Sequence, residues 1–457
     1  MKCSRYNFLF PLSDGTELFF NFYTLSLLAF KPGQAQKALR VLNHPGKTPA
    51  KGIDGRLGRL LAKNGFLVPR LCDEVAHLER TFRTCRSQEA HLGLTLLPTL
   101  DCNFKCRYCY ERSENRSRMS RDVEDALIAF VGGKLASGGR LSVTWFGGEP
   151  LLCMDTVERL SRAFFELCAS RRTGYDSHIV TNGYLLDGKT ASRLKDLKVT
   201  RAQVTLDGPP EIHDRRKPLA GGGKTFRRIV DNLKEAVGFM EITIRMNVDA
   251  ENSSDLGRLL DILVEEGLAD KVGFYPGQTA PYTLACADIA GQCLGGEEFS
   301  LAVLDASLEL TRRGLLDASG PAARSSPCGA TQRSSYTVTP VGGIVSCWND
   351  VAEPREYVGH LLTPPDSVME DNKKKWLAFN PFSLACRECL ILPICMGACP
   401  YVYLKTGKPA CIGWKHHTQE HLLNYFRLKS IERQARVALG FRGLVDELRT
   451  RSSPKKS

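Results

Sequence analysis

The feature that most constrains the fold is a sixfold alternation of strand-like and helix-like segments that begins at Leu92. Short apolar runs predict the strands, and longer stretches with helical periodicity between them predict the helices. Consecutive strand–helix units favour a parallel sheet with outer helices, and they place chemistry at the carboxyl ends of the strands. Six units rather than eight predict an α/β fold built on a partial (βα)6 barrel. The predicted strands are 92–98, 141–146, 177–181, 201–206, 241–248 and 271–275, and the predicted helices are 120–137, 155–170, 187–196, 225–238, 253–266 and 297–314.

A smaller α+β unit precedes this alternation. Tyr6–Pro11 and Glu17–Asn21 flank Ser13-Asp14-Gly15, which is a hairpin signal. Helical patterns at about 34–44 and 55–65, followed by the apolar run Phe66–Val68, give this unit the order of a winged-helix module. The sequence therefore predicts five parts: a winged-helix-like domain (1–70), a linker with a helix at about 72–88 (71–91), the partial barrel (92–318), a cysteine-rich domain (319–415) and a basic carboxyl-terminal helix and tail (416–457).

Composition excludes several classes of protein. Hydrophobic residues make up 43% and charged residues 25% of the 457 residues, which is the balance of a folded globular protein. The longest apolar stretch, Leu18 to Phe30, is too short for a bilayer span, and no signal-peptide pattern opens the chain. We therefore expect a cytoplasmic protein with no membrane partner. Residues 421–457 hold nine Lys/Arg against three Asp/Glu, which favours a solvated helix face over a nucleic-acid contact.

The 17 cysteines are numerous and unevenly placed. In a reducing cytosol such groups favour metal binding or catalysis over disulfides. Cys102, Cys106 and Cys109 directly follow the first predicted strand, so that three thiolates on one loop can surround one face of an iron–sulfur cube. Zinc is the alternative, but a C-x3-C-x2-C run with no fourth ligand nearby suits a closed zinc site poorly.

This motif, on the loop after strand one of a βα series, resembles that of the radical S-adenosylmethionine superfamily. The resemblance implies a [4Fe–4S] cluster on Cys102, Cys106 and Cys109, with S-adenosyl-L-methionine on the fourth iron. Reductive cleavage of that cofactor would give a 5′-deoxyadenosyl radical that abstracts hydrogen from the substrate. Tyr108 matches the aromatic residue that lies beside the adenine in the family, and a flavodoxin- or ferredoxin-type reductant is implied.

Other strand ends resemble cofactor-binding positions of the same superfamily. Phe146 is followed by Gly147, Gly148, Glu149 and Pro150 at the end of the second predicted strand. Paired glycines let the backbone approach a ligand, and in the family this position receives the amino group of the cofactor. Asn182 after strand three, and Arg245 with Asn247 on strand five, resemble further cofactor-side positions, although a turn or a polar strand face would give the same residues.

The run Leu206-Asp207-Gly208-Pro209-Pro210-Glu211-Ile212-His213-Asp214 follows the fourth predicted strand. A plain turn with a surface histidine would account for it. It also resembles a stretch shared by sulfatase-maturing enzymes and maturases of ribosomal peptides. The resemblance implies that Asp207 and His213 face the active site.

A second group of cysteines lies beyond residue 320. Zinc would fit an isolated C-x2-C pair, with His416 or His417 as further ligands. As a set, the seven spacings resemble the SPASM extension of radical peptide-modifying enzymes, which implies two auxiliary [4Fe–4S] clusters. By that resemblance Cys328, Cys347 and Cys399 hold the first cluster. The resemblance gives the second cluster the ligands Cys386, Cys389, Cys395 and Cys411. Eight thiolates would fill two cubes, so the first cluster has an open iron unless Cys286 or Cys293 reaches it.

These features together resemble a radical SAM/SPASM maturase of ribosomally made peptides. The resemblance implies a precursor peptide whose leader binds the amino-terminal domain by strand addition, and a thioether or carbon–carbon crosslink in its core. The enzyme alternative is an anaerobic sulfatase-maturing, formylglycine-generating enzyme. That family places a carboxylate base directly after the cysteine matching Cys347, whereas Trp348 stands here and Asp350 is the candidate base. A non-catalytic electron carrier or regulator that binds nucleic acid is the alternative from another class.

Overall fold

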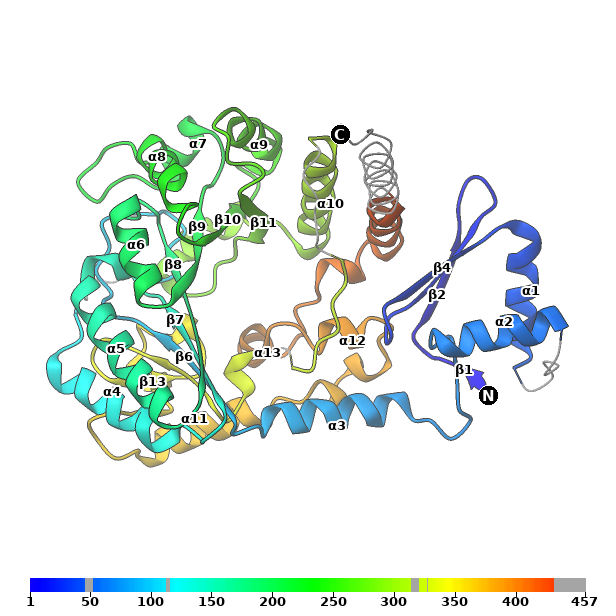
Figure 1. The fold of residues 1–457 in the computed structure, drawn as a ribbon, viewed down its shortest axis with the longest axis horizontal. Coiled ribbons are helices and arrows are strands. Elements are labelled where there is room, and N and C mark those ends of the chain that lie inside the picture. Colours follow the sequence, from blue (N-terminus) through cyan, green and yellow to red (C-terminus); the bar gives the residue numbers. More distant parts are fainter. Residues whose placement is uncertain (46–51, 112–115, 314–319, 327, 431–457) are drawn as a thin grey trace, which may run out of the picture.

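The computed structural model describes residues 1–45, 52–111, 116–313, 320–326 and 328–430. The amino-terminal unit lies at one end of the molecule and the partial barrel at the other (Figure 1). The segment from about 320 to 430 fills much of the space between them, and helix α3 (Glu74–Arg86) runs along one side of the molecule to join them. No helix of the described residues is long and apolar enough to cross a membrane.

The barrel is formed by six parallel strands in sequence order, which confirms the predicted α/β class. Each strand pairs with the one before it, from β6 through β11. The predicted strand 241–248 has the same bounds as β10, and the ends of the other five predicted strands differ from the observed ends by at most three residues. The strands are β6 (His91–Leu96), β7 (Arg140–Trp145), β8 (Gly174–Thr181), β9 (Val199–Thr205), β10 (Glu241–Val248) and β11 (Val272–Gln278).

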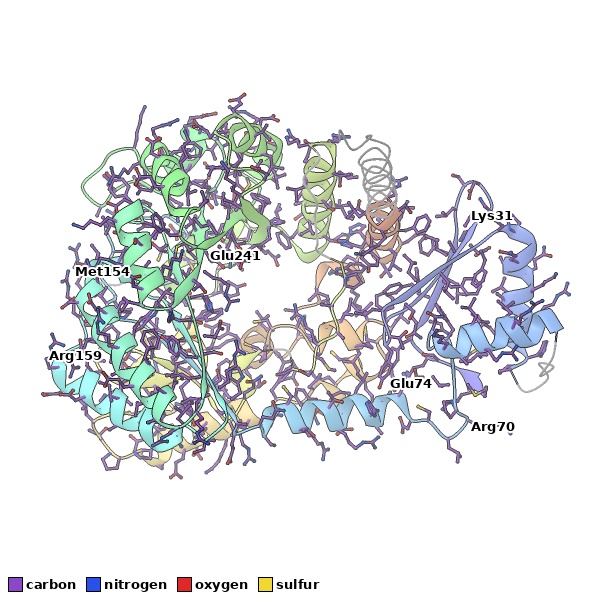
Figure 2. The ribbon with its side chains drawn as sticks, in the orientation of Figure 1. Lys31, Arg70, Glu74, Met154, Arg159 and Glu241 are labelled. Atoms are coloured by element: carbon purple, nitrogen blue, oxygen red, sulfur yellow. The ribbon has the colours of Figure 1, made fainter. Side chains whose placement is uncertain are left out.

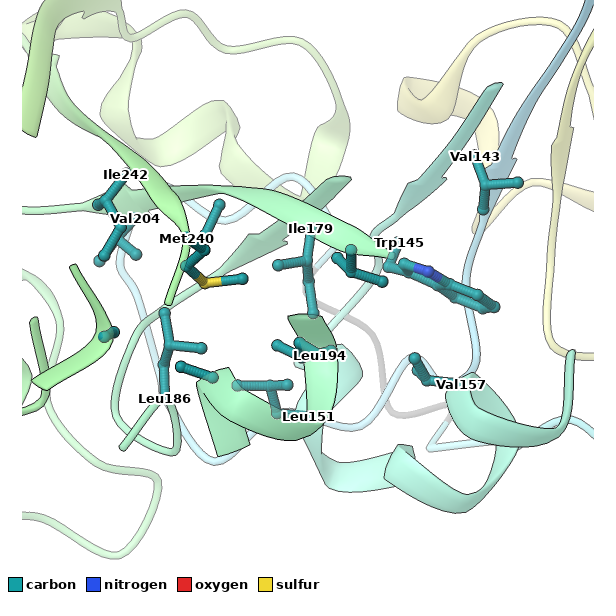
Figure 3. Packing of buried hydrophobic residues seen from close by; sticks show 14 of the residues in the cluster. Val143, Trp145, Leu151, Val157, Ile179, Leu186, Leu194, Val204, Met240 and Ile242 are labelled. Carbon is teal, nitrogen blue, oxygen red and sulfur yellow. The ribbon is translucent and has the colours of Figure 1, made fainter. Parts of the chain in front are cut away.

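Helices cover the outer face of this sheet, as the alternation predicts. Residues of β7 alternate between the two faces. Leu141, Val143 and Trp145 are buried in the core beneath the helices, whereas Ser142 and Thr144 face the barrel interior and are half-buried. Figure 3 shows the Trp145 ring next to Val157 of α5, with Val143 further away on the same side of the picture. The helices are α4 (Arg121–Lys134), α5 (Met154–Ser170), α6 (Gly188–Asp196), α7 (Pro210–Arg216), α8 (Phe226–Ala236), α9 (Leu256–Glu265) and α10 (Gly296–Arg312).

Two parts of this sheet are not predicted by the sequence pattern. Strands β12 (Ser335–Val338), β13 (Gly343–Val345) and β14 (Gly359–His360) extend the sheet to nine strands, with β12 parallel to β6. The pattern instead indicates that strand–helix alternation stops at about 320. Helix α7 is also absent from the predicted elements, because Pro209-Pro210 reads as a turn.

The carboxyl-terminal region adds short helices to these strands. They surround the second group of cysteines and end in a helix whose described part is 418–430; the rest of the predicted basic tail, 431–457, lies outside the described residues. The α-helices between them are α11 (Ser367–Ala378), α12 (Leu392–Cys395) and α13 (Pro400–Thr406).

The amino-terminal unit contains the predicted hairpin and helices, with an extra strand at the sheet edge. Strands β2, β3 and β4 form an antiparallel sheet in that order, while β1 pairs with the short β5. The elements are β1 (Lys2–Cys3), β2 (Asn7–Pro11), β3 (Glu17–Asn21), β4 (Ser26–Phe30), α1 (Pro32–Asn43), α2 (Gly52–Lys63) and β5 (Leu67–Val68).

Strand β3 is buried on both faces, which explains its uninterrupted apolar sequence. Phe19 packs on one face into the core formed with α1 and α2. Leu18 and Phe20 pack on the other face into a core that includes Leu392 and Met396 from the second cysteine region. The amino-terminal sheet is therefore a layer between its own helices and that cysteine region.

Helix α3 joins this unit to the rest of the chain through a buried acidic side chain. Figure 2 marks Glu74 at the start of α3. Its Oε1 atom accepts a hydrogen bond from Ser4 Oγ at 2.5 Å, and its Oε2 atom accepts one from the Arg5 amide at 3.1 Å. Asp73 caps the helix by accepting from the amide of Ala76. The predicted linker helix is therefore fixed at its first turn to the amino-terminal unit.

Candidate functional site

The loop that carries the cysteine triplet leaves the carboxyl end of β6 and is fixed along its length. The Lys105 amide donates to Pro218 O at 2.9 Å, and the Ala220 amide donates to Asn103 O at 2.8 Å. Phe104 is buried and forms a bridge with Leu219. The segment after α7 therefore holds this loop on one side.

The three thiols of this loop are close enough to raise one another's pKa. Burial raises the pKa of Cys102 to about 12, and it also raises the pKa of Cys109, with smaller contributions from the neighbouring thiols. The Cys102 sulfur accepts from the Phe104 amide at 3.4 Å, and the side-chain amide of Asn182 lies 3.9 Å from it. The hydrogen bond from Phe104 lowers the pKa of Cys102 and so opposes part of the effect of burial.

The donor set fits an iron–sulfur cube better than a single ion. Among the described residues, no three His, Cys, Asp or Glu side chains gather around one position for a metal ion. A cube binds each thiolate through a different iron atom and so needs more widely spaced sulfurs. Three cysteines on one loop supply the three protein ligands that the expected cluster needs.

The Gly-Gly-Glu-Pro loop after β7 packs directly on the start of the triplet loop. The Gly148 amide donates to Thr99 O at 3.1 Å, and the Glu149 amide donates to Asp101 O at 2.9 Å. A Cβ atom at Gly148 would lie 2.2 Å from Asp101 O, and Gly147 has a φ of +108°. Only glycine allows this approach, so the two loops that resemble family motifs are fixed to each other.

Glu149 is fully buried at this junction, and most of its acceptor capacity is used. Its Oε1 atom accepts from Thr181 Oγ1 at 2.7 Å and from the Leu151 amide at 3.1 Å. Its Oε2 atom accepts from the Asn182 amide at 2.8 Å and has one further lone pair. Burial raises the pKa of this carboxyl, and the three hydrogen bonds oppose that effect. The remaining acceptor position can receive one N–H donor.

Asp207, which follows β9, is tied to Tyr108 of the triplet loop. The Tyr108 hydroxyl donates to Asp207 Oδ2, and the Asn247 amide donates to Asp207 Oδ1 at 3.0 Å. Lys217 Nζ lies 3.3 Å from the Tyr108 hydroxyl, and the Arg216 guanidinium stands 5.2 Å from its ring centroid. Asp207 is fully buried. Its contacts position Tyr108.

Arg216 is the centre of a buried ion network that the sequence motifs do not identify. It is 2% exposed and pairs with Asp249 at 2.8 Å, with Glu251 at 3.1 Å and with Asp207 at 3.6 Å. Lys217 is 5% exposed. A run of charged residues directly after a predicted site motif is the signal that could have pointed to them, but charge runs are more often solvated.

His213 is fully buried on α7 and faces the backbone of Asp207. Its Nδ1 atom accepts from the Asp207 amide at 3.2 Å, and its ring is 5.6 Å from that of Phe226. Burial lowers its pKa to about 4, so the ring is neutral. Within the described residues, Nε2 has no hydrogen-bond partner. This geometry makes His213 a positioning residue for Asp207.

Asn182 directly follows β8, and Arg245 lies in the second half of β10, paired with Thr205 at the end of β9. Arg245 Nε donates to Asn247 Oδ1 at 2.7 Å, and a Cβ atom at Gly277 would lie 2.5 Å from this nitrogen. Asn182 Nδ2 donates to Asn103 Oδ1 at 2.7 Å. Both side chains therefore lie at the edge of the sheet that carries the triplet.

The later cysteines form two electrostatic groups. Cys328, Cys347 and Cys399 influence one another, since the pKa of Cys347 is raised by burial and then by the other two thiolates. A second group surrounds Lys415, whose pKa is raised by Cys411 and then by Cys389, with a smaller contribution from Cys386. Burial raises the pKa of Cys386 and of Cys395, and the thiols that add to this effect are Cys389 and Cys411 of the second group.

The two candidates for an eighth thiolate lie close to the tyrosines that pack against the first of these groups. The Cys286 thiol is buried and donates to Thr283 O at 3.4 Å, while the Cys293 thiol donates to Ile289 O at 3.4 Å. The charged neighbours of Cys293 are Asp249 and Arg216. Burial raises the pKa of Tyr282, with contributions from Cys399, Cys347 and Cys293, and burial also raises the pKa of Tyr401, with contributions from Cys347 and Cys286.

Asp350 is 2% exposed and lies in the short turn η5 (Trp348–Asp350) after Cys347. Burial raises its pKa to about 7, and Lys405, 4.0 Å away, opposes this effect. Its Oδ2 atom has no hydrogen-bond partner among the described residues. Asp350 is thus a buried carboxyl close to the group of Cys328, Cys347 and Cys399.

Aromatic residues occupy the region between the triplet and this cysteine group. Burial raises the pKa of Tyr110, and both Cys109 and Cys347 contribute to the increase. The rings of Tyr110 and Tyr282 are 6.4 Å apart, and those of Tyr282 and Tyr401 are 6.2 Å apart. No motif in the sequence marks these tyrosines.

Comparison with known proteins agrees with this arrangement. Residues 96–263 match the family model described as the Radical SAM superfamily. Fe-coproporphyrin III synthase from Methanosarcina barkeri is 29% identical over 218 residues, which is 47% of this chain and 50% of that protein. The cysteine-type anaerobic sulfatase-maturating enzyme from Clostridium perfringens is 24% identical over 341 residues, covering 67% of this chain and 88% of that protein. The chain spans about half the length of the first of these relatives.

Solved structures share the fold. The structure of native anSMEcpe with bound AdoMet and Cp18Cys peptide has a TM-score of 0.54 at 17% identity, covering 75% of this chain and 99% of that one. Streptococcus suis SuiB bound to precursor peptide SuiA has a TM-score of 0.50 at 16% identity, covering 90% of this chain and 98% of that one. At these identities the likeness is one of fold.

Proposed function

We propose, from a radical SAM domain at residues 96–263, that this chain is an enzyme that modifies a ribosomally made precursor peptide. The observation that carries the proposal is the junction of the Cys102–Cys109 loop with Gly148 and Glu149, where two hydrogen bonds and a glycine-only approach join a three-thiol loop to a buried carboxylate. A [4Fe–4S] cluster and S-adenosylmethionine bound there would supply a carbon radical that abstracts hydrogen from the substrate.

The residues of the junction have separate roles in this proposal. Cys102, Cys106 and Cys109 hold the cluster, and the free acceptor position of Glu149 receives the cofactor's amino group. Arg245 and Asn182 lie at the same edge and complete the cofactor site. Asp207 and His213 act through Tyr108, which they hold in one orientation with the help of Lys217.

The two later cysteine groups would hold auxiliary clusters. We infer that Cys328, Cys347 and Cys399 bind the first cluster and that the group around Lys415 binds the second. Crosslinking at an unactivated carbon is an oxidation, so one electron must leave the substrate after hydrogen abstraction. Cys109 of the triplet and Cys347 of the first group both raise the pKa of Tyr110, after burial, so we propose that a cluster on the first group accepts that electron. A flavodoxin- or ferredoxin-type protein would reduce the triplet cluster.

The amino-terminal unit would bind the leader of the precursor. In the described residues, β4 has β3 as its only neighbouring strand, and its Leu27 and Leu28 are half-buried. An edge strand with free backbone groups can accept an added strand. We infer a reducing cytoplasmic compartment from the clustered cysteines of the sequence.

The second candidate function is that of a sulfatase-maturing enzyme. The relative from Clostridium perfringens favours it, because the alignment covers most of that protein. Against it, Trp348 stands where that family has its base, and Asp350 is buried two residues further on. Aldehyde-specific labelling of a Cys-containing peptide after incubation with the enzyme would detect formylglycine and decide for this alternative.

The direct test of the proposed function uses the anaerobically reconstituted enzyme and the precursor encoded nearest to its gene. We expect 5′-deoxyadenosine formation together with a precursor mass lower by an even number of hydrogens. Hydrogen exchange in the presence of the leader should slow at β4 and stay unchanged at β2, while a leader of scrambled order should protect neither strand. If the core is modified but hydrogen exchange at β4 does not change, the proposed reaction stands and the proposed binding of the leader at β4 is wrong.

A further inference from the structure

The second cysteine of the triplet lies directly opposite a buried lysine. The triplet loop runs antiparallel to the segment that follows α7, and the bridge between Phe104 and Leu219 shows the register. In the same register, two hydrogen bonds run from the amides on either side of Cys106 to the carbonyls on either side of Lys217: Lys105 to Pro218 at 2.9 Å and Arg107 to Arg216 at 3.4 Å. Side chains of directly opposite residues project from the same face of such a pair. Cys106 and Lys217 are therefore neighbours.

The ammonium group of Lys217 lies beside the middle of the triplet loop. Its Nζ atom is 5.8 Å from the centroid of the Phe104 ring and 5.7 Å from that of the Tyr108 ring. The same atom lies 3.3 Å from the Tyr108 hydroxyl. Phe104 and Tyr108 are the residues two before and two after Cys106, so the ammonium group lies between the aromatic rings that flank the cysteine. In agreement, burial raises the pKa of Cys106, and Lys217 gives the largest opposing effect.

Lys217 is a buried cation that no carboxylate neutralises directly. Its side chain is held in place by its backbone, because its amide donates to His213 O at 2.8 Å and its carbonyl accepts from Thr225 Oγ1 at 2.8 Å. In the part of the chain that the structure describes, Lys217 forms no ion pair, whereas the adjacent Arg216 pairs with three carboxylates. Buried charges are normally paired, because an unpaired charge loses its hydration without compensation. We therefore expect Lys217 to have a negative partner.

A thiolate of the triplet loop is the partner that this geometry offers. Cys106, as a ligand of a [4Fe–4S] cluster, would carry negative charge next to the ammonium group. Reduction transfers one electron from the reductant to the cluster and increases the negative charge there, which a nearby cation stabilises. Charge and hydrogen bonding at the ligand sulfurs are among the features that set the reduction potential of such clusters. A cation beside Cys106 therefore makes a cluster easier to reduce.

We propose that Lys217 raises the reduction potential of the triplet cluster through its ammonium group, which lies beside the Cys106 side chain. This inference rests on the proposed function, because it takes the triplet to hold a cluster. It gives the ligands unequal surroundings, since Cys102 accepts a hydrogen bond from the Phe104 amide, whereas Cys106 faces a cation. Lys217 is then a tuning residue, because it acts on the cluster through one of the ligands.

A redox titration of the reconstituted enzyme tests this role without turnover. Dithionite reduces the enzyme in the absence of S-adenosylmethionine, and electron paramagnetic resonance follows the signal that disappears when all three triplet cysteines are replaced by Ala. In Lys217→Met, we expect the ratio of reduced to oxidised cluster at a fixed potential to fall about tenfold, which is a shift of about 59 mV to more negative values. Lys217→Arg keeps the charge and should stay close to the wild type.

The matched control is Lys224→Met, which removes the same charge from an exposed position on the same loop between α7 and α8. Water and salt screen the charge of Lys224, so the potential should not change. Iron content and circular dichroism spectra equal to those of the wild type show that each variant is assembled. If Lys217→Met does not take up iron, Lys217→Gln decides by the same criterion, because it is neutral and keeps a hydrogen-bond donor.

The outcomes separate this inference from the proposed function. An unchanged potential in Lys217→Met, or an equal shift in Lys217→Arg, would overturn the tuning role. Weaker binding of S-adenosylmethionine by Lys217→Met at an unchanged potential would assign the ammonium group to the cofactor and would also overturn it. If no signal disappears from the variant without triplet cysteines, the triplet holds no cluster, and the proposed function is refuted together with the inference that rests on it.

Discussion

Replacing Gly148 by Ala perturbs the junction of the two loops with a single methyl group. The added Cβ atom would lie 2.2 Å from Asp101 O and 2.7 Å from both the Asp101 carbonyl carbon and Leu100 O. Ordinary contacts are about 3.5 Å, so one loop must move away by roughly 1 Å. The obstructing atoms are all backbone, and no side-chain rotation can relieve the overlap.

The cost of this movement follows from the hydrogen bonds it breaks. Overpacking of a buried site costs about 1–3 kcal/mol. Loss of the bonds from the Gly148 and Glu149 amides adds about 0.5–1.5 kcal/mol each. A displacement of about 1 Å in a reacting group lowers catalytic rates by about 100-fold. We therefore expect weaker binding of S-adenosylmethionine and a rate of 5′-deoxyadenosine formation lower by about two orders of magnitude.

The matched control is Gly133→Ala in helix α4, where an added Cβ atom has no neighbour within 4 Å. It should stabilise the helix by about 0.5–1 kcal/mol and leave the cofactor chemistry unchanged. Equilibrium dialysis of S-adenosylmethionine and chromatography of 5′-deoxyadenosine compare the two variants at equal iron content. Equal binding and equal rates for Gly148→Ala and Gly133→Ala would refute the argument that the two loops form one site.

Three further predictions concern other parts of the chain. Burial lowers the pKa of His421 to about 4, whereas the value in the unfolded chain is about 6.5. The stabilising contribution of the neutral ring is therefore complete above pH 6.5 and is lost as the pH falls toward 4. His421→Gln should therefore lose less stability than the wild type between pH 7.5 and pH 5, by up to about 2 kcal/mol, and equal pH dependence of the thermal midpoints would show that His421 does not titrate in this way. Cys286→Ala/Cys293→Ala should retain the full iron content, because both thiols donate to nearby carbonyls, and loss of about four irons per chain would show that one of them is a ligand. His213→Phe removes the acceptor of the Asp207 amide and should raise the KM for S-adenosylmethionine, and His213→Asn should restore part of it; an unchanged KM in both variants would contradict the positioning role.

The elements of the barrel are predictable because their signals are local. The apolar run of β10 and the pattern of α5 lie within single windows of the sequence, and their ends agree with the structure to within a residue. Strand β12 depends on pairing with β6, which is more than 200 residues away, and β13 and β14 are added in turn to β12. All three strands are too short to have a pattern of their own. Helix α7 is hidden by two prolines, which favour a first helical turn as much as a loop.

The candidate site shows the same division between local and distant signals. Cys102 and Glu149 can be expected near one another, because the ends of neighbouring parallel strands meet at one edge of the sheet. The burial of His213 and the ion network of Arg216 cannot be predicted from the sequence. His213 contacts the Asp207 segment and Arg216 pairs with Asp249, and these segments come together only in the fold. In the sequence, Trp348 is notable only because it occupies the position where sulfatase-maturing enzymes have a base. Its stacking on Phe146 can be seen only in the structure.

The central claim is that the Cys102–Cys109 loop and the Gly148–Glu149 junction hold a cluster that cleaves S-adenosylmethionine. Its most direct test is to replace Cys102, Cys106 and Cys109 together by Ala and to measure iron content and 5′-deoxyadenosine after anaerobic reconstitution. The matched control replaces Cys3, Cys72 and Cys85, which lie outside every proposed cluster. We predict loss of about one third of the iron and of all 5′-deoxyadenosine in the first variant, and no change in the control. Continued formation of 5′-deoxyadenosine by the first variant would contradict the account.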